Sequence, residues 1–163
     1  MAEIVLCCGK VSSGKSTFAR RLAAERGHFP FSADEWMRHF YGEPPEREVF
    51  DRQLGQCCEM IYRMAERLLA RGVDVVLDFG FWQRAERIAV RQRFEAAGHS
   101  CRLVYCAIAP AQQWAFLQQR QAQTTLDHFR FDAEGIATLN AFFEPPGEDE
   151  HALMPDACLR LPT

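Results

Sequence analysis

The stretch from Gly9 to Thr17 constrains this chain more than any other segment. It reads GKVSSGKST and completes the pattern G-x-x-x-x-G-K-[ST], in which a glycine-rich loop and the first turn of a helix surround a polyphosphate. The glycines let the backbone turn successive N–H groups toward the ligand, and the helix start adds the positive end of its dipole. We therefore predict that this loop binds nucleotide phosphates through Gly9, Lys10, Val11, Ser12, Ser13, Gly14, Lys15, Ser16 and Thr17.

The flanking residues supply the strand and the helix that such a loop requires. Residues 3–8 form a short apolar run typical of a buried strand, and residues 17–26 have the apolar spacing of a helix. Lysine occurs only at positions 10 and 15, although the chain holds 19 basic residues. In the predicted loop, Lys15 would contact the β- and γ-phosphates of ATP, and the Ser16 hydroxyl would hold Mg²⁺.

Length and composition indicate one globular domain. The chain has 163 residues, of which 48% are hydrophobic and 25% are charged, and this is enough to bury a core. A net charge of −3 gives no general attraction to nucleic acid. No span approaches the roughly 18 apolar residues of a membrane helix, and no early segment resembles a signal peptide. The seven cysteines lack the spacing of a metal site or a disulfide framework, so we expect a cytoplasmic protein without a membrane partner.

Asp34 follows a predicted second strand at residues 29–32. Because the carboxyl ends of parallel strands share one edge of a sheet, Asp34 should lie on the same edge as the phosphate loop. A carboxylate there can accept the proton of a hydroxyl that attacks the γ-phosphate. The alternative is a first-turn acid that only stabilises a helix, since Ser32 and Glu35 form a capping pattern. We favour the catalytic role.

A second carboxylate, Asp78, ends the apolar run that starts at Val73. An acid at the end of a buried strand beside a phosphate loop supports Mg²⁺ directly or through water. The helix predicted for residues 82–97 carries Arg84 and Arg87 near the same edge, where either could pair with a substrate. Four arginines on this helix are also typical of a solvated, outward face.

The C-terminal part of the chain predicts a helical lid. A helix starts at Pro110 and reaches Arg120, and residues 118–131 are polar and only weakly periodic. Such a segment can close over ATP and exclude water, which would bring Arg120 and Arg130 to the charge on the transferring phosphoryl group. A plain surface connection is the alternative. A further helix is expected from Asp132.

These motifs together resemble the small P-loop kinases of the AAA type, relatives of chloramphenicol phosphotransferase, zeta toxins and polynucleotide 5′-kinase domains. The resemblance rests on GKVSSGKST, SADEW, VVLDFGFW and FEPPGEDE and covers nearly the whole chain. It implies an α/β, three-layer P-loop NTPase fold with a five-stranded parallel sheet, helices on both faces and a helical lid. The expected strands are residues 3–8, 29–32, 73–78, 102–108 and 158–161, in a single domain, 1–163, with its lid at about 118–131.

The resemblance also implies a reaction, the transfer of the γ-phosphoryl group of ATP to a hydroxyl with Mg²⁺ as the metal. It makes Asp34 the base and Arg120 a lid arginine, and it places Pro145 beside the adenine. Relatives commonly have a second lid arginine where this chain has Gln123 and Thr124. Either Arg130 replaces it, or catalysis is weaker than in the relatives.

We therefore predict an ATP-dependent kinase of a small hydroxyl-bearing molecule. The alternatives are a nucleic-acid 5′-hydroxyl kinase, which the acidic balance argues against, and a non-catalytic ATP-binding module. The acceptor and the oligomeric state stay open. The predicted catalytic residues are Lys15, Asp34 and Arg120, the metal ligands are Ser16 and Asp78, and the residues predicted to line the acceptor site are Asp34, Trp36, Asp78, Arg84 and Arg87.

Overall fold

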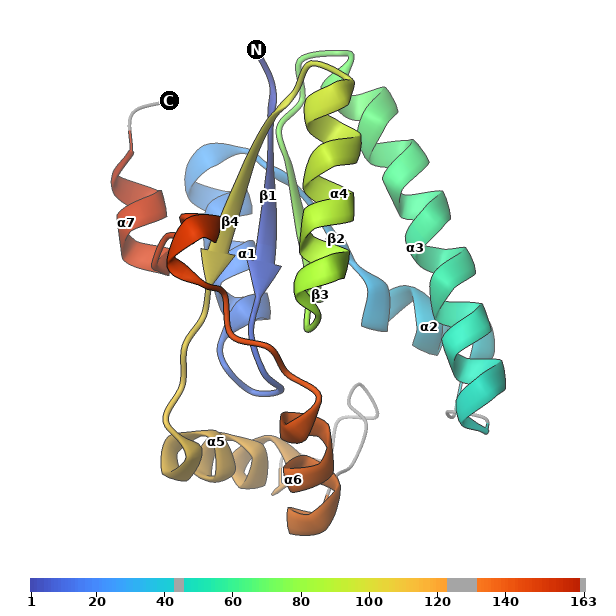
Figure 1. Cartoon of the computed structure of the whole chain (residues 1–163), viewed down its shortest axis with the longest axis vertical. Helices are drawn as coiled ribbons and strands as arrows, with labels where there is room; N and C mark the ends of the chain where they lie inside the picture. Colours follow the sequence, from blue (N-terminus) through green and yellow to red (C-terminus); the bar gives the residue numbers. More distant parts are fainter. Residues whose placement is uncertain (43–45, 123–131, 162–163) are drawn as a thin grey trace.

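A parallel sheet forms the centre of the protein in the computed structural model, which describes residues 1–42, 46–122 and 132–161. Its strands lie in the order β2-β3-β1-β4, and every paired neighbour is parallel. Figure 1 shows the strands pointing the same way, with their carboxyl ends toward α5 and α6. The strands are β1 (Glu3–Cys8), β2 (Phe29–Ser32), β3 (Val75–Gly80) and β4 (Ser100–Tyr105).

Helices cover both faces of this sheet, which gives three layers. Figure 1 shows α3 and α4 together on one side of the strands. The helices are α1 (Lys15–Arg26), α2 (Ala33–Tyr41), α3 (Arg47–Leu69), α4 (Arg84–Ala96), α5 (Pro110–Ala122), α6 (Ala133–Ala141) and α7 (Pro155–Arg160), with a short 3₁₀ turn at Glu148–Glu150. Among the described residues, no helix is both long and apolar enough to cross a bilayer.

The alternation of side chains along β1 explains why the core consists of two clusters. Ile4 and Leu6 belong to one core cluster, together with residues of α3 and α4. Val5 and Cys7 belong to the other, with Phe18 of α1 and a cysteine of α7. Because helices cover both faces, the strand is apolar at consecutive positions, as is usual for a parallel sheet. All seven cysteines are free.

The expected fifth strand is wrong. Four strands pair in the described part of the chain, and residues 155–160, which include most of the predicted strand, form the helix α7. Leu153 alone takes the position beside β4: its N–H donates to the Leu103 carbonyl (2.9 Å), and its carbonyl accepts from the Tyr105 N–H (2.8 Å). Pro155 then starts the helix, where its missing N–H costs nothing.

Other details also differ from the prediction, such as β4, which covers Ser100–Tyr105 and not residues 102–108. β3 continues past Asp78 to Gly80, because the Gly80 carbonyl accepts a hydrogen bond from the Gly9 N–H at 3.0 Å. The register between β1 and β3 shifts there, between Cys7 and Cys8. The helix predicted for residues 82–97 forms as α4, but Arg87, which was expected to face outward, is buried.

Candidate active site

The phosphate loop leaves β1 at Gly9 and enters α1 at Lys15, as predicted. Gly14 caps the helix with φ 92°, a left-handed conformation that favours glycine. Gly9 is needed for a different reason, since a Cβ there would lie 2.5 Å from Ser13 Oγ and 2.7 Å from the Cys106 carbonyl oxygen. Both glycines therefore serve the shape of the loop.

The N-terminus of α1 has features that suit the binding of an anion. Among the described residues, it has neither a side-chain cap nor an acid in its first turn, whereas α2 starts with a Ser32 cap and two acids. Ser13 Oγ is buried and has no hydrogen-bond partner in the described part of the chain. An open helix N-terminus and an unused buried hydroxyl fit the oxygens of a phosphate group.

The pairing of strands brings the two predicted acids to this loop. Asp78 on β3 lies opposite Ser32 of β2 on one side and opposite Cys7 of β1 on the other. Asp34 follows Ser32 by two residues, in the first turn of α2. Since all three strands end at the same edge, the acids lie where the phosphate loop begins.

Lys15 interacts electrostatically with both acids. Burial lowers the pKa of its ammonium group, while the charges of Asp78 and Asp34 act in the opposite direction. Its Nζ donates to the Lys10 carbonyl oxygen at 2.6 Å, so the side chain folds back over the loop. A phosphate on the loop would offer this ammonium group a charged partner in place of a carbonyl.

Asp34 has a carboxyl group with a raised pKa. Burial raises the pKa of its carboxyl group, Lys15 opposes that shift, and the charge of Asp78 adds to it. The side chain is nevertheless accessible to solvent. A carboxylate with a raised pKa that a ligand can reach is a better proton acceptor near neutral pH than an ordinary one.

The structure places Arg120 at the same point. It lies on α5 and its Nη1 donates to Ser12 Oγ at 3.1 Å. Burial lowers the pKa of its guanidinium group, and the charges of Asp34 and Asp78 raise it. Lys15, Asp34, Asp78 and Arg120 thus come together from four elements. The lid segment at residues 123–131, with Gln123, Thr124 and Arg130, lies outside the described residues.

Three neighbouring residues were not predicted from the sequence. Arg38 follows Asp34 by one helical turn on α2, and its charge acts on Asp34 and on Arg120. Helical spacing from Asp34 could have indicated it. Gln113 donates to the loop and pairs with Asn140, and no motif distinguishes these two residues from the other amides of this chain.

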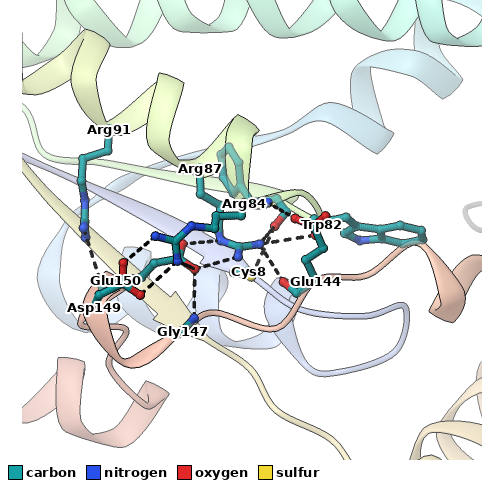
Figure 2. A network of polar contacts seen from close by, with 10 residues as sticks. Cys8, Trp82, Arg84, Arg87, Arg91, Glu144, Gly147, Asp149 and Glu150 are labelled. Atoms are coloured by element: carbon teal, nitrogen blue, oxygen red, sulfur yellow. Dashed lines mark hydrogen bonds and ion pairs between the residues drawn. The ribbon is translucent and has the colours of Figure 1, made fainter.

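Arg84 and Arg87 do not point to this cluster of acids. Arg87 is 2% exposed, and its guanidinium donates to Glu150 and to the carbonyls of Phe81 and Glu144. Figure 2 shows the contacts of Arg87 with Glu150 and Glu144, and Arg84 pairs with Asp149 beside them. The expectation of an outward Arg87 is wrong because Glu150 compensates its charge inside the protein.

Two further residues were predicted to contact ligands, Trp36 the acceptor and Pro145 the adenine. Trp36 packs edge-on against Phe31 and Phe40, with ring centroids 6.2 and 5.9 Å apart. Pro145 is exposed and follows Glu144, whose N–H donates to the Trp82 carbonyl at 2.9 Å.

Among the described residues, few potential protein ligands for Mg²⁺ lie at this edge of the sheet. No three potential acidic, histidine or cysteine ligands converge among the described residues. Ser16 is exposed at the start of α1, and Asp78 lies at the neighbouring strand end. Two oxygens of this kind fit an ion that takes most of its ligands from water and substrate phosphates.

The model of an AAA domain family matches residues 4–146. The chain belongs to this AAA domain family. A search of curated proteins finds no significant match.

This AAA domain is similar to several solved structures, among them the following three. A protein of Chloroflexus aurantiacus J-10-fl, provisionally described as a kinase, has a TM-score of 0.73 at 19% identity, covering 94% of this chain and 86% of its own. Kti12 of Chaetomium thermophilum, solved with ADP-AlF3, has a TM-score of 0.69 at 17% identity, covering 93% and 87%. The Mycobacterium tuberculosis APS kinase CysC, solved with AMPPNP and APS, has a TM-score of 0.60 at 20% identity, covering 89% and 83%. At these identities, the likeness shows the fold.

Proposed function

We propose that this protein transfers the γ-phosphoryl group of ATP to a hydroxyl group of a small molecule. One observation carries the proposal: Lys15, Asp34, Asp78 and Arg120 interact electrostatically at the carboxyl edge of the sheet, beside a phosphate loop. A structural ion pair would need two of these groups. Four, on separate elements and partly accessible, are the parts of a phosphoryl-transfer site.

Each residue has a role in this proposal. The loop amides and Lys15 bind the phosphates of ATP, and Asp34 accepts the proton of the attacking hydroxyl. Arg120 donates hydrogen bonds to the equatorial oxygens of the transferring group, where negative charge accumulates. Ser16 and Asp78 would hold Mg²⁺, an ion that supplies neutralisation of phosphate charge.

The solved structures support the proposal at the level of ligands. Kti12 was solved with ADP-AlF3, and the APS kinase with AMPPNP and APS, so similar folds hold a nucleotide and, in the second case, a small second substrate. For this chain, both the nucleotide and the small acceptor are part of the proposal.

Binding is tested first, by a thermal-shift titration with ATP and Mg²⁺. A ligand at a hundredfold excess over its dissociation constant stabilises the folded state by about 2.7 kcal/mol. We expect a clear rise of the unfolding temperature for the wild type and none for Lys15→Ala. Absence of a shift in folded wild-type protein would overturn the proposal.

Transfer is tested next, with γ-labelled ATP and a panel of sugars, nucleosides, aminoglycosides and chloramphenicol. The matched variants are Asp34→Asn and Glu35→Gln, because Glu35 is the exposed neighbouring acid on α2. We expect Asp34→Asn to slow transfer to the accepted compound about 10²–10⁴-fold and Glu35→Gln to retain it. Equal transfer by both variants would refute the role of Asp34 as the base.

A further inference from the structure

Two side-chain amides connect α5 and α6. Asn140 Nδ2 donates to Gln113 Oε1 at 2.8 Å, and Gln113 Nε2 donates to Asn140 Oδ1 at 3.1 Å. The same Gln113 Nε2 donates its second hydrogen to the carbonyl oxygen of Val11, in the phosphate loop, at 3.0 Å. The pair therefore extends from α6 through α5 to the loop.

This arrangement fixes the orientation of the Gln113 amide. The side chain is 2% exposed, so water does not compete for its hydrogen bonds. Both N–H groups and the carbonyl oxygen have protein partners, and a rotated amide would bring its oxygen toward the Val11 carbonyl and its NH₂ group toward the Asn140 NH₂ group. The Val11 carbonyl therefore selects one orientation of the Gln113 amide, and Asn140 holds the amide there through two hydrogen bonds.

The bond to Val11 also fixes the peptide that follows it. In a trans peptide, the carbonyl and the next N–H point in opposite directions. When Gln113 holds the Val11 carbonyl toward α5, the N–H of Ser12 points away from α5. The orientation of this loop amide therefore depends on Gln113.

Ser12 itself has an unfavourable backbone conformation. Its φ is 58°, in the left-handed region that non-glycine residues seldom adopt. Such a residue persists where its surroundings over-determine it. Here α5 contacts the loop twice in succession, through Gln113 on the Val11 carbonyl and through Arg120 on Ser12 Oγ.

We propose that Gln113, oriented by Asn140, is a positioning residue for nucleotide binding: it holds the Val11–Ser12 peptide in the conformation that the phosphates require. The proposal rests on the nucleotide-binding function proposed above. Gln113 itself touches no phosphate in it. The α5–α6 pair then contributes to the affinity for ATP through a peptide of the loop.

The experiment measures nucleotide affinity and stability separately. Gln113→Met keeps the length of the side chain and removes its hydrogen bonds. Asn140→Leu keeps Gln113 and removes the group that orients it. Gln112→Met is the control, because Gln112 is the exposed preceding residue of α5. Each protein is titrated calorimetrically with AMPPNP and Mg²⁺, and its unfolding temperature is measured without nucleotide.

We expect Gln113→Met to raise the dissociation constant about tenfold, which corresponds to about 1.4 kcal/mol. Asn140→Leu should raise it by a smaller factor, and Gln112→Met should leave it unchanged. If Gln113 had only a structural role, Gln113→Met would lower the unfolding temperature and leave the affinity for AMPPNP unchanged. That result would overturn the inference. If Gln113→Met does not fold, an unchanged affinity of Asn140→Leu overturns it instead. Failure of the wild type to bind AMPPNP would refute the proposed function, which is a separate outcome.

Discussion

Arg87 and Glu150 form a doubly hydrogen-bonded ion pair across 63 residues of sequence. Arg87 Nε lies 2.7 Å from Glu150 Oε2, and Nη2 lies 2.9 Å from Oε1, with side chains only 2% and 5% exposed. Nη1 donates to the carbonyls of Phe81 and Glu144, both at 2.9 Å. One guanidinium therefore connects the end of β3 to the segment that follows α6, as Figure 2 shows.

Replacing Arg87 by Leu should destabilise the protein strongly. The change removes the two hydrogen bonds of Arg87 from the buried Glu150 carboxylate, and breaking a buried ion pair typically costs about 3–5 kcal/mol. Arg47→Leu is the matched control, because Arg47 pairs with Asp51 at side-chain exposures of 72% and 52% and does not contact Glu150. An exposed pair contributes about 0–1 kcal/mol. Urea unfolding of the three proteins measures the difference, and similar losses for both variants would contradict the buried pair.

The same pair predicts a pH dependence of stability. Its hydrogen bond to Arg87 lowers the pKa of the Glu150 carboxyl group. A carboxyl with a lowered folded pKa stabilises the protein above its unfolded pKa, about 4.3, and this contribution is lost as the pH falls through the folded value. The stability difference between wild type and Glu150→Gln should therefore be largest near pH 7 and shrink below pH ~4. Urea unfolding across this range measures it.

Glu148→Gln provides the control for that series, since Glu148 is exposed in the same short turn. Its stability should follow that of the wild type at every pH. The difference in the free energy of unfolding between the wild type and Glu150→Gln could instead stay constant down to pH ~3. That result would mean that the ionisation of Glu150 does not stabilise the Arg87–Glu150 pair.

The phosphate loop and its acids could be predicted because local sequence determines them. Gly14 and Lys15 follow an apolar strand directly, and the pattern admits one backbone shape. Asp34 and Asp78 each come at or just after the end of a strand, and parallel pairing brings strand ends together without further information. Sequence order alone therefore places these residues at one edge.

Contacts between distant segments could not be predicted in this way. Arg87 has the sequence context of a solvated helix face, and only the approach of Glu150 from the other end of the chain makes its burial possible. The fifth strand fails for a similar reason, because an apolar stretch of a few residues suits a short strand or a short helix equally. Pro155 decides in favour of the helix.

Replacing Asp34 by Asn should separate activity from stability. Removal of a general base typically lowers the rate about 10²–10⁴-fold. Stability should rise at neutral pH, because burial and the charge of Asp78 raise the pKa of Asp34 and make its ionised form unfavourable in the folded state. That gain should vanish below the unfolded pKa of about 3.9, where both states are protonated. Thermal unfolding at pH 7 measures this gain in stability. A lower unfolding temperature for Asp34→Asn than for the wild type would contradict the raised pKa of Asp34.

Replacing Gly9 by Ala should remove nucleotide binding. The new Cβ would lie 2.7 Å from the backbone oxygen of Cys106, which cannot move without distorting the sheet end, so the loop must change shape. Gly55→Ala is the control, because nothing lies within 4 Å of its Cβ position in α3, and helix propensity favours alanine by about 1 kcal/mol. We expect no ATP-induced thermal shift for Gly9→Ala and a full shift for Gly55→Ala. A normal shift for Gly9→Ala would show that the close approach of Gly9 is not required.

Replacing Arg120 by Ala should affect turnover more than binding. Its guanidinium lies at Ser12 and within the electrostatic influence of Asp34 and Asp78, where charge would develop on the transferring group. Loss of one such donor typically lowers kcat about 10²–10³-fold. Arg20→Ala is the control, since Arg20 is an exposed neighbouring charge on α1. Steady-state kinetics with the accepted compound should show a large fall in kcat for Arg120→Ala, a change of KM for ATP within about tenfold, and little change for Arg20→Ala. A rise in KM with kcat unchanged would instead make Arg120 a residue of ground-state binding.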